Sequence, residues 1–428
     1  MRKMDYQNVK GTQDYLPEAE VIRRKIRRTL EDTFIQYGCK PLETPILNYT
    51  ELMASKYGGG AEILEEMYTL TDRGERDLAL RYDLTIPFAK VVAMNPAIRM
   101  PFKRYEIGKV FRDGPIKTGR FREFTQCDVD IVGVESQIAE AELMEMALSA
   151  FTKLDLKIAV QYNNRKLLSG MLEMFEVPTD QMSAVILVLD KLEKVGVPAV
   201  KKELSELGLP LTVVDSIERF LTDEKNKTIN YYVLFSKVNN NIEQGVNELK
   251  ALESFLAYLK ISEQCIFNPF LARGLEIYTG TIYELFLVDK TIKSSIGSGG
   301  RYDNAIAGLL GSDQSFSTVG ISFGLDVIYT AISLNDSAAI EASLLDYYII
   351  PMNTLMESLL VATRLRQKGY KVELDMSNKK IGKALDRANS EGIQNVIIVG
   401  ENEVELNQIT VKNMETGETR VEPFQFSS

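Results

Sequence analysis

Residues 103–133 read KRYEIGKVFRDGPIKTGRFREFTQCDVDIVG, which is two runs of alternating apolar residues separated by a loop with glycine and proline. Alternation at a period of two is typical of strands, and the turn-forming loop DGPIKTG predicts that the two runs pair as an antiparallel hairpin. On the returning run, Gln126, Asp128 and Asp130 recur at every second position, so they share one face of the predicted sheet.

Cations gather at the loop end of this hairpin: Arg112, Lys117, Arg120 and Arg122. A guanidinium can bind phosphate in a bidentate way, and the neighbouring carboxylates suit an amine or an imidazolium. The pattern therefore predicts a rigid sheet that presents phosphate-binding and cation-binding groups side by side. A hairpin whose charged side chains only face solvent is the alternative, because exposed charges are common and contribute little.

Composition indicates an ordinary globular chain. The 428 residues are 45% hydrophobic and 26% charged, which fits roughly two or three domains with a large core. No apolar run approaches the roughly 18 residues of a membrane span, and the start MRKMDYQNVKG lacks an apolar signal core. Three scattered cysteines, Cys39, Cys127 and Cys265, are too few for a disulfide framework or zinc cluster. We expect a cytoplasmic protein without a membrane anchor.

The chain contains no histidine and has a net charge of −10. The first fact excludes an imidazole general base, a Ser–His pair and a His-ligated metal, so catalysis must use carboxylates, cations, amides, hydroxyls or a bound metal. The net charge argues against a protein coated in basic surface. It leaves room for a local basic patch that contacts nucleic-acid phosphates.

The 103–133 segment resembles motif 2 of class II aminoacyl-tRNA synthetases, in the form found in histidyl-tRNA synthetases. Further segments match that family in the same order, and LARGLEIYTG resembles the peptide peculiar to histidyl enzymes and their close relatives. They are KGTQDYLP at 10–17, LRYDLTIPFAK at 80–90, LARGLEIYTGTIYE at 271–284, GSGGRYDNAIAGLLG at 297–311 and VGISFGLDVI at 319–328. The resemblance spans nearly the whole chain.

The resemblance implies an α+β fold, with a class II antiparallel sheet core flanked by helices, a helical insertion and a C-terminal α/β domain. The parts expected are a catalytic core with motifs 1 and 2 (1–158), the insertion (159–265), a second core piece with the histidyl peptide and motif 3 (266–335), and an anticodon-binding domain (345–428).

Local patterns give the expected elements of the first three parts. Apolar residues at a spacing of four from Ile22 to Phe34 predict an amphipathic helix over 17–37. PLETPILN at 41–48 is strand-like, and Pro45 indicates an edge or a bend. In the family this helix–strand pair is motif 1, a dimer-interface element. Helices are predicted at 138–156, 185–196 and 247–260, and a strand at 156–164.

Residues 329–345 are a linker candidate, because Asn335, Asp336 and Ser337 break the pattern. Strands and helices then alternate through DYYIIP, YKVELDM, KKIGKALDRANSEG, NVIIVG and TVKNMETGETRVEP, which predicts a small α/β domain. Its second helix carries a cluster of cations that could meet phosphate, with a solvated helix face as the alternative: Lys379, Lys380, Lys383 and Arg387.

For the nucleotide, the resemblance implies ATP with Mg²⁺ and no metal site made by the protein alone. Arg112 matches the arginine that grips the ATP α-phosphate, and Arg273 matches an arginine special to histidyl enzymes beside the same phosphate. Both are candidate catalytic residues, because they would stabilise charge in an in-line displacement. Arg120 and Phe124 match positions near the triphosphate and the adenine.

For the amino acid, five residues match histidine-binding positions of the family. Asp83 and Thr85 match acceptors for the α-amino group, and Gln126 matches a residue that contacts the amino-acid backbone. Asp130 matches a carboxylate that binds the imidazole ring, and Tyr278 matches the other ring contact.

Two departures from the family pattern stand out. The histidyl peptide normally has two adjacent tyrosines where this chain has Ile277-Tyr278, so one hydroxyl is lost from the pocket wall. Motif 3 ordinarily ends Gly-Leu-Glu-Arg and here reads Gly-Leu-Asp-Val, with Val327 in place of the arginine that holds the γ-phosphate. A lost charge-assisted contact costs roughly 1.5–3 kcal/mol.

The function implied by the resemblance is that of a histidine–tRNA ligase, with histidine, ATP and tRNA(His) as substrates and a homodimer as the assembly. Val327 keeps a second interpretation open, in which the chain is a non-catalytic or repurposed paralogue. Such a paralogue would be a histidine sensor or a regulatory subunit of ATP phosphoribosyltransferase. The C-terminal α/β domain favours the ligase, because those regulatory relatives commonly lack it.

Overall fold

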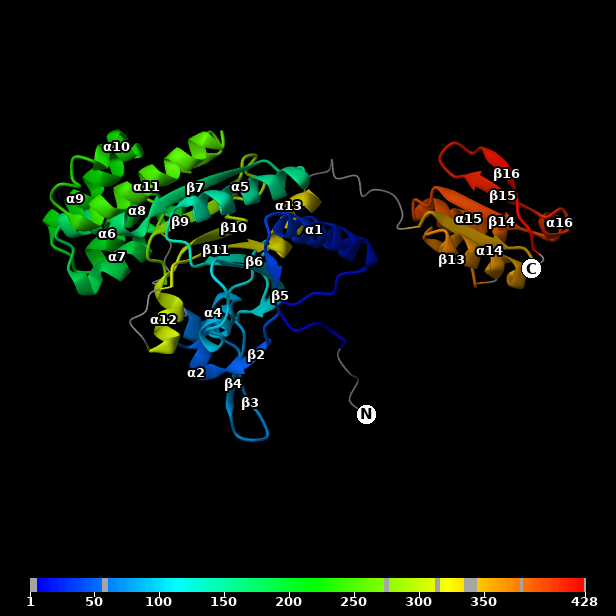
Figure 1. The fold of residues 1–428 in the computed structure, drawn as a ribbon, viewed down its shortest axis with the longest axis horizontal. Coiled ribbons are helices and arrows are strands. Elements are labelled where there is room, and N and C mark those ends of the chain that lie inside the picture. Colours follow the sequence, from blue (N-terminus) through cyan, green and yellow to red (C-terminus); the bar gives the residue numbers. More distant parts are fainter. Residues whose placement is uncertain are drawn as a thin grey trace. The chain divides into compact units, whose positions relative to one another are not determined.

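The computed structural model describes residues 6–55, 61–272, 277–311, 316–334, 345–377 and 380–426, with backbone alone at 61–63 and 193–194. The chain divides into two compact units, Met1–Asn335 and Asp336–Ser428. Figure 1 labels their helices and strands. Within the described ranges, no helix is both long enough and apolar enough to cross a membrane.

The first unit is built on an eight-stranded sheet of order β1-β5-β6-β11-β10-β9-β7-β8. The strands are β1 (Lys40–Pro41), β5 (Phe102–Phe111), β6 (Glu123–Val132), β7 (Ile158–Asn164), β8 (Cys265–Phe267), β9 (Thr281–Leu287), β10 (Gly297–Arg301) and β11 (Thr318–Gly324). Only the outermost pairs, β1–β5 and β7–β8, are parallel. The other neighbours are antiparallel, which confirms the expected α+β class with an antiparallel core.

The predicted hairpin is the pair β5–β6, with Phe102 opposite Val132 and Phe111 opposite Glu123. Cys127, Val129 and Ile131 alternate with the polar residues of β6 and are buried in the main hydrophobic core. The period-two prediction is thus confirmed, and β6 carries core residues on one face and polar residues on the other.

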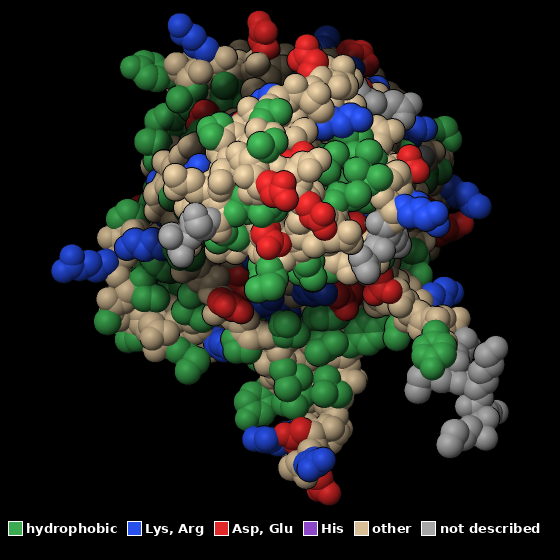
Figure 2. Space-filling view, turned by 90° about the vertical axis from the view of Figure 1, so that its right-hand side faces the viewer, with side chains coloured by type: hydrophobic (Ala, Val, Ile, Leu, Met, Phe, Trp, Pro, Cys, Tyr) green, Lys and Arg blue, Asp and Glu red, His purple; other side chains and the backbone are tan. Residues whose placement is uncertain are grey.

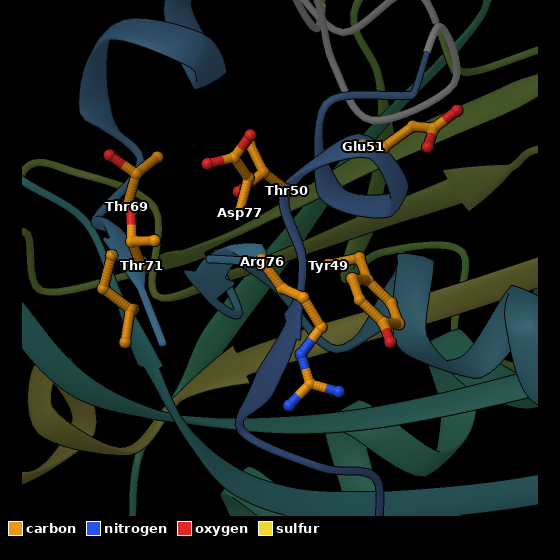
Figure 3. Close-up of a pocket in the computed structure, with 8 residues that line it drawn as sticks. Tyr49, Thr50, Glu51, Thr69, Thr71, Arg76 and Asp77 are labelled. Carbon is orange, nitrogen blue, oxygen red and sulfur yellow. The ribbon is translucent and has the colours of Figure 1, made fainter. Parts of the chain in front are cut away.

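A smaller sheet of order β2-β4-β3 projects from the first unit. It contains β2 (Leu47–Tyr49), β3 (Thr69–Thr71) and β4 (Asp77–Leu80), with helices α2 (Thr50–Met53), α3 (Ala61–Glu66) and α4 (Thr85–Met94) nearby in sequence. Figure 2 shows hydrophobic side chains gathered on this projecting lobe, above a tip with charged side chains. A pocket of about 670 Å³ opens between its strands, lined by Tyr49, Thr71, Arg76 and Asp77 among others (Figure 3).

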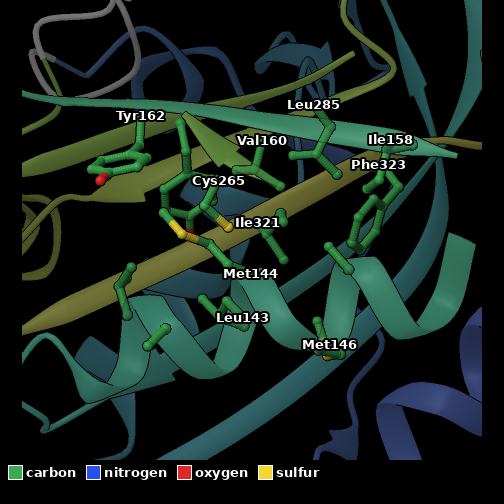
Figure 4. Packing of buried hydrophobic residues seen from close by; sticks show 14 of the residues in the cluster. Leu143, Met144, Met146, Ile158, Val160, Tyr162, Cys265, Leu285, Ile321 and Phe323 are labelled. Atoms are coloured by element: carbon green, nitrogen blue, oxygen red, sulfur yellow. The ribbon is translucent and has the colours of Figure 1, made fainter. Parts of the chain in front are cut away.

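Helices cover the apolar face of the large sheet. They are α1 (Pro17–Gln36), α5 (Ile138–Lys153), α11 (Asn240–Tyr258) and α13 (Leu325–Leu334). Figure 4 shows Met144 of α5 pointing at Val160 and Ile321 of the sheet. Ile26, Leu30 and Phe34 of α1 have no exposed surface, so the predicted amphipathic helix is confirmed. On the opposite side, α4 packs with α12 (Asn304–Leu310).

The predicted strand over 41–48 is wrong in part, because the structure contains only β1 and β2 at its two ends. Between them, the backbone N–H and hydroxyl of Thr44 donate to the carboxylate of Glu106, each at 2.9 Å. The carbonyl of Thr44 accepts from Nη1 of Arg81 at 2.7 Å. Pro45 has no N–H to give a sheet. Side chains, rather than a neighbouring strand, therefore satisfy this backbone.

Helices dominate the region after β7: α6 (Arg165–Met174), α7 (Met182–Leu189), α8 (Leu192–Glu206), α9 (Leu211–Thr222), α10 (Ile229–Tyr232) and α11, with short 3₁₀ turns η1 (Thr179–Gln181) and η2 (Glu224–Lys227). The single helix predicted over 185–196 is wrong: it divides into α7 and α8, and Gly196 has a non-helical φ of 78°. The boundary expected after residue 158 falls inside β7, and the one after 265 falls inside β8.

The second unit has a five-stranded sheet of order β13-β12-β14-β15-β16. Its elements are β12 (Tyr347–Pro351), α14 (Leu355–Gln367), β13 (Val372–Leu374), α15 (Ile381–Ser390), β14 (Asn395–Val399), α16 (Glu401–Glu405), β15 (Gln408–Asn413) and β16 (Thr419–Pro423). The predicted alternation is confirmed, although α16 was not foreseen. The linker prediction is wrong over 329–334, which belong to α13, and residues 335–344 lie outside the described ranges.

Candidate active site

The candidate site lies on the polar face of the β5–β6–β11 strands. The register places Asp130 between Arg104 and Gly320, and places Asp128 between Glu106 and Ser322. A Cβ added at Gly320 would lie 2.0 Å from Oδ1 of Asp130. Glycine is therefore required there, because any side chain would displace the carboxylate.

The charge on this face is organised by Arg104, whose side chain has no exposed surface. Its Nη2 lies 2.6 Å from Oδ2 of Asp130, and its guanidinium lies 4.3 Å from the ring centre of Phe88. The hydroxyl of Tyr302 donates to the other oxygen of Asp130. Burial raises the pKa of Asp130, while Arg104 and the Tyr302 hydrogen bond lower it. This carboxylate thus has one hydrogen-bond donor, Tyr302, and one close counter-charge, Arg104.

A second buried ion pair attaches the LRYDLT segment to the hairpin. Nη1 of Arg81 lies 2.7 Å from Oε1 of Glu106, and Nε of Arg81 donates to the carbonyl of Lys109 at 2.7 Å. Both charged side chains are almost fully buried. This attachment fixes where the chain enters α4, and so fixes the position of Asp83.

Asp83 and Thr85 stand at the start of α4. Oδ1 of Asp83 accepts a hydrogen bond from the backbone N–H of Ile86 at 3.1 Å, as carboxylates do at helix N-termini. Burial raises the pKa of Asp83, and the charges of Arg112 and Arg104 oppose that shift. Thr85 is the first residue of the helix. The structure therefore brings Asp83 into the same electrostatic environment as the hairpin.

Arg112 directly follows β5 and lies against two aromatic rings. Its guanidinium carbon is 4.2 Å from the ring centre of Tyr82 and 5.1 Å from that of Phe124. Its Nε donates to the carbonyl of Tyr82 at 3.2 Å. That bond uses one of five guanidinium donors and holds the plane in a fixed orientation. Arg112 and Phe124, both assigned to ATP by the resemblance, are in contact.

The loop between β5 and β6 separates the other predicted cations. Arg120 and Lys117 are exposed, and their backbones pair with each other. Arg122 pairs with Asp113 at 2.7 Å, and both side chains are partly exposed.

Val327, which replaces the motif 3 arginine, is partly buried against the main core. A Cβ added at Gly119 would lie 3.4 Å from Cα of Val327, so the end of the loop packs against the start of α13. An apolar contact therefore stands where the family places a cation.

Sequence reasoning missed a cluster around Asp326. This carboxylate lies 2.5 Å from Nη1 of Arg23, accepts from the hydroxyl of Tyr15, and accepts from the backbone N–H of Thr125 at 2.7 Å. It thereby joins the KGTQDYLP segment, α1, motif 2 and motif 3. The available signal was a charged residue, Arg23, beside Ile22 and Ile26 on the apolar side of a helix.

The remaining histidine-binding candidates lie on both sides of β10. Nε2 of Gln126 donates to the hydroxyl of Ser322 at 2.7 Å. The ring of Tyr278 lies over Gly300, where an added Cβ would be 2.8 Å from its Cδ1. Ile277 packs with the hydrophobic cluster that contains Tyr82. The candidate catalytic residue Arg273 lies outside the described residues.

Comparison with known proteins accounts for these features. A family model described as histidyl-tRNA synthetase matches residues 11–328, and a model described as an anticodon binding domain matches residues 346–426. The chain belongs to the histidyl-tRNA synthetase family. Within that family, β5 and β6 carry motif 2, and β11 and the start of α13 carry motif 3.

Individual relatives cover essentially the whole chain. "Histidine--tRNA ligase 2" of Shouchella clausii (strain KSM-K16) is 59% identical over 426 residues, with 100% of each chain covered. "Histidine--tRNA ligase 1" of Bacillus cereus (strain ATCC 14579) is 57% identical over 417 residues, covering 97% of this chain and 96% of the relative. A solved histidyl-tRNA synthetase from Nostoc sp. PCC 7120 is 27% identical, with a TM-score of 0.83 and 98% and 97% coverage.

A solved ATP phosphoribosyltransferase regulatory subunit/histidyl-tRNA synthetase from Bacillus halodurans C is also similar. It is 18% identical, with a TM-score of 0.75, and covers 92% of this chain and 98% of that chain. At this identity the likeness shows the shared fold alone. The family and the α+β architecture expected from the sequence are confirmed by these comparisons.

Proposed function

We propose that this chain is a histidine–tRNA ligase, which joins histidine to ATP as histidyl-adenylate and then transfers the histidyl group to tRNA(His). The observation that carries the proposal is the arrangement of an oriented guanidinium, Arg112 at the end of β5, near Asp83 at the start of α4, with the acceptors Gln126 and Asp130 on the neighbouring strand β6. The names of relatives that are 57% and 59% identical over nearly their whole length support it.

Adenylate formation suits a site without histidine. The carboxylate of the amino acid is itself the nucleophile, so the protein mainly positions the reactants and stabilises charge on the α-phosphate. Arg112 lies against the rings of Tyr82 and Phe124, and its guanidinium can present paired N–H donors to that phosphate. Arg273 is proposed to act on the same phosphate from the histidyl peptide.

Histidine is proposed to lie along β6, with its α-amino group toward Asp83, Thr85 and Gln126 and its ring toward Asp130 and Tyr278. The separation of these groups follows the strand, because side chains on one face recur about every 7 Å. The Arg104–Asp130–Tyr302 network fixes the Asp130 carboxylate before substrate binds. Because the Asp130 carboxylate is already fixed in position, it favours one orientation of the imidazole ring of histidine.

ATP is proposed to place its adenine near Phe124 and its triphosphate near Arg120. Mg²⁺ would arrive on that triphosphate as part of the substrate, because it usually binds one or two carboxylates together with phosphates.

The second unit is proposed to bind the anticodon arm, and the small sheet to form part of a homodimer interface. The small-sheet region exposes Ile46, Leu47, Tyr49 and Leu70, each more than two-fifths exposed. Apolar area of this kind is typical of surfaces that associate. A cytoplasmic location is part of the same proposal.

The non-catalytic paralogue is retained as the competing function because of Val327. An arginine at this position would supply charge to the γ-phosphate, and valine supplies none. Since relatives named as ligases are so similar over the full length, we take the ligase as the conclusion.

The test is ATP–pyrophosphate exchange with the purified full chain, which measures adenylate formation without tRNA. We expect exchange that depends on histidine and is lost with other amino acids. Arg112→Ala should reduce the rate by roughly a hundredfold or more, as for other preorganised charge-stabilising donors. Arg24→Ala, at an exposed position of α1, is the control. Exchange absent from the wild-type protein would favour the paralogue.

A further inference from the structure

Asp128 has an unusual environment within the site. Its side chain is only 3% exposed, and its Oδ1 accepts no hydrogen bond from any residue that the structure describes. Oε1 of Gln126, two residues away on the same face, is also buried and without a donor among those residues. Buried acceptors are nearly always satisfied, so a pair of unsatisfied ones calls for an explanation.

The protein groups around Asp128 give its Oδ1 no hydrogen bond. Ser322, opposite Asp128 on β11, accepts from Nε2 of Gln126 at 2.7 Å and bonds the Asp128 carboxylate with its single hydroxyl proton. Arg104 directs its Nη2 toward Asp130 at 2.6 Å, and its buried Nε and Nη1 have no hydrogen-bond partner among the described residues. Glu106, opposite Asp128 on β5, is an acceptor itself and is paired with Arg81. None of these groups donates to Oδ1 in this arrangement.

Asp130 on the same face has a different set of partners. It has the same burial, yet the hydroxyl of Tyr302 donates to its Oδ1, and Nη2 of Arg104 lies 2.6 Å from its Oδ2 as an ion pair. The fold therefore places a cation within ion-pair distance of one carboxylate of this face and, among the described residues, none within that distance of its neighbour. A group that serves only to hold the strand would not require an ionisable oxygen without a partner.

We propose that Asp128 is a further substrate-binding residue, whose free oxygen accepts a hydrogen bond from the α-ammonium group of histidine. The inference rests on the proposed function, because it assigns a contact within that site. With Asp128, the proposed binding site for the ammonium group includes the polar face of β6 as well as Asp83 and Thr85 at the N-terminus of α4.

The chemistry of the acceptors selects an ammonium. Oδ1 of Asp128 and Oε1 of Gln126 are acceptors on one face of β6, and the charge of Asp83 acts on Asp128. A phosphate or a carboxylate would be repelled there. An ammonium has one positive charge and three N–H donors, which matches three acceptors, whereas an imidazole has at most two donors.

The electrostatic state of Asp128 is consistent with this role. Burial, with Asp130 and Asp83 nearby, raises the pKa of Asp128 to about 8, and Arg104 and the Ser322 hydrogen bond oppose the shift. Glu106 on β5 adds a further acidic group to its surroundings. A cation placed beside Oδ1 would stabilise the ionised carboxylate that the empty protein disfavours.

The test compares the full-length wild-type protein with Asp128→Asn by calorimetric titration with two ligands. Histidine carries the ammonium, and 3-(imidazol-4-yl)propanoic acid is the same molecule without it. We expect the variant to bind histidine roughly tenfold or more weakly, as for loss of a hydrogen bond to a charged group. Both proteins should bind the ammonium-free acid equally.

Thermal unfolding at pH 8 without ligand distinguishes a substrate-binding role of Asp128 from a role in stabilising the fold. Asparagine has the same shape but cannot ionise, so the variant should unfold at the same or a higher temperature than the wild type. Asp130→Asn is the matched control, and it should unfold at a lower temperature because it removes the nearest counter-charge of the buried Arg104.

The outcomes separate the two hypotheses. Wild-type binding of histidine with an unchanged affinity in Asp128→Asn would overturn this inference alone. Equal losses for both ligands, with a lower unfolding temperature, would identify a structural role and would also overturn it. A wild-type protein that does not bind histidine would overturn the proposed function and this inference together.

Discussion

Arg104 shows how a single residue sets the charge of the site. Its guanidinium is fully buried, faces Asp130 at 2.6 Å and Glu106 at 3.6 Å, and lies over Phe88. Without this cation, three buried carboxylates would share one sheet face, which is unfavourable for any ionised pair among them. The positive charge of Arg104 is therefore needed for the carboxylates on β6 to be ionised.

Replacing Arg104 tests that dependence. Arg104→Leu should destabilise the protein by about 3–5 kcal/mol at pH 7, because breaking a buried pair leaves an uncompensated charge. Denaturant unfolding measures the change. The double variant Arg104→Leu/Asp130→Asn removes both charges and should recover part of the loss. If it is as unstable as the single variant, the ion pair is not the cause.

Asp128 also makes a prediction about pH. Its folded-state pKa is raised to about 8, so between its unfolded value of about 3.9 and pH 8 the folded protein binds more protons than the unfolded chain. This contribution to stability is present below pH 4 and is lost as the pH rises through 8. Asp128→Asn lacks it, so the stability of the variant relative to wild type should increase from pH 5 to pH 9. Denaturant midpoints across this range measure the trend, and parallel curves would contradict it.

The sequence predicted part of the site at this scale. Gln126 and Asp130 were found because period-two spacing places them on one face, and Asp83 and Arg112 through the family motifs. Arg104, Ser322 and the roles of Asp128 and Asp326 were missed. Their partners are 18 to 303 residues away or on another strand, as for Arg23 and Asp326, and sequence spacing carries no signal for such pairs.

At the scale of elements, the β5–β6 hairpin was predictable because both of its faces are strictly patterned. The break between β1 and β2 was not, since it depends on Glu106 and Arg81 satisfying the backbone of Thr44. The division between α7 and α8 falls at Asp190 and Lys191, and Gly196 adds a break with a φ of 78° inside α8. Apolar periodicity continues across residues 190 and 191 and therefore predicted one helix.

The Asp326 cluster joins α13 to α1 and β6, and its removal should be costly. Asp326→Ala takes the partner from Arg23 and from the backbone N–H of Thr125, both of which are buried. We expect a loss of about 3–5 kcal/mol in unfolding free energy. Asp303→Ala, whose carboxylate is partly exposed, is the comparison and should cost less. Equal losses in the two variants would show that the cluster has no special role.

At the scale of the whole molecule, assembly should depend on the small sheet. Leu70 of β3 is 41% exposed beside Tyr49 and Leu47. Leu70→Glu should shift a dimer toward monomer, because it places a charge in an apolar interface. Sedimentation at several concentrations measures this shift. Leu211→Glu, at an exposed position of α9, is the control and should leave the assembly unchanged. A wild-type protein that is monomeric would contradict the homodimer proposal.

The complete absence of histidine from 428 residues also belongs to the whole molecule. A ligase that contains none of its own amino acid can be translated when histidine is scarce, so we expect the protein to accumulate during histidine starvation while synthesis of histidine-containing proteins stalls. Pulse labelling of starved cells measures both. A version with Lys202→His and Lys225→His, two exposed positions, should lose the advantage without losing its fold. Deletion of the chain should deepen the growth defect under starvation. If its synthesis falls in step with bulk translation, compositional drift is the better explanation, since surface histidines are replaceable without selection.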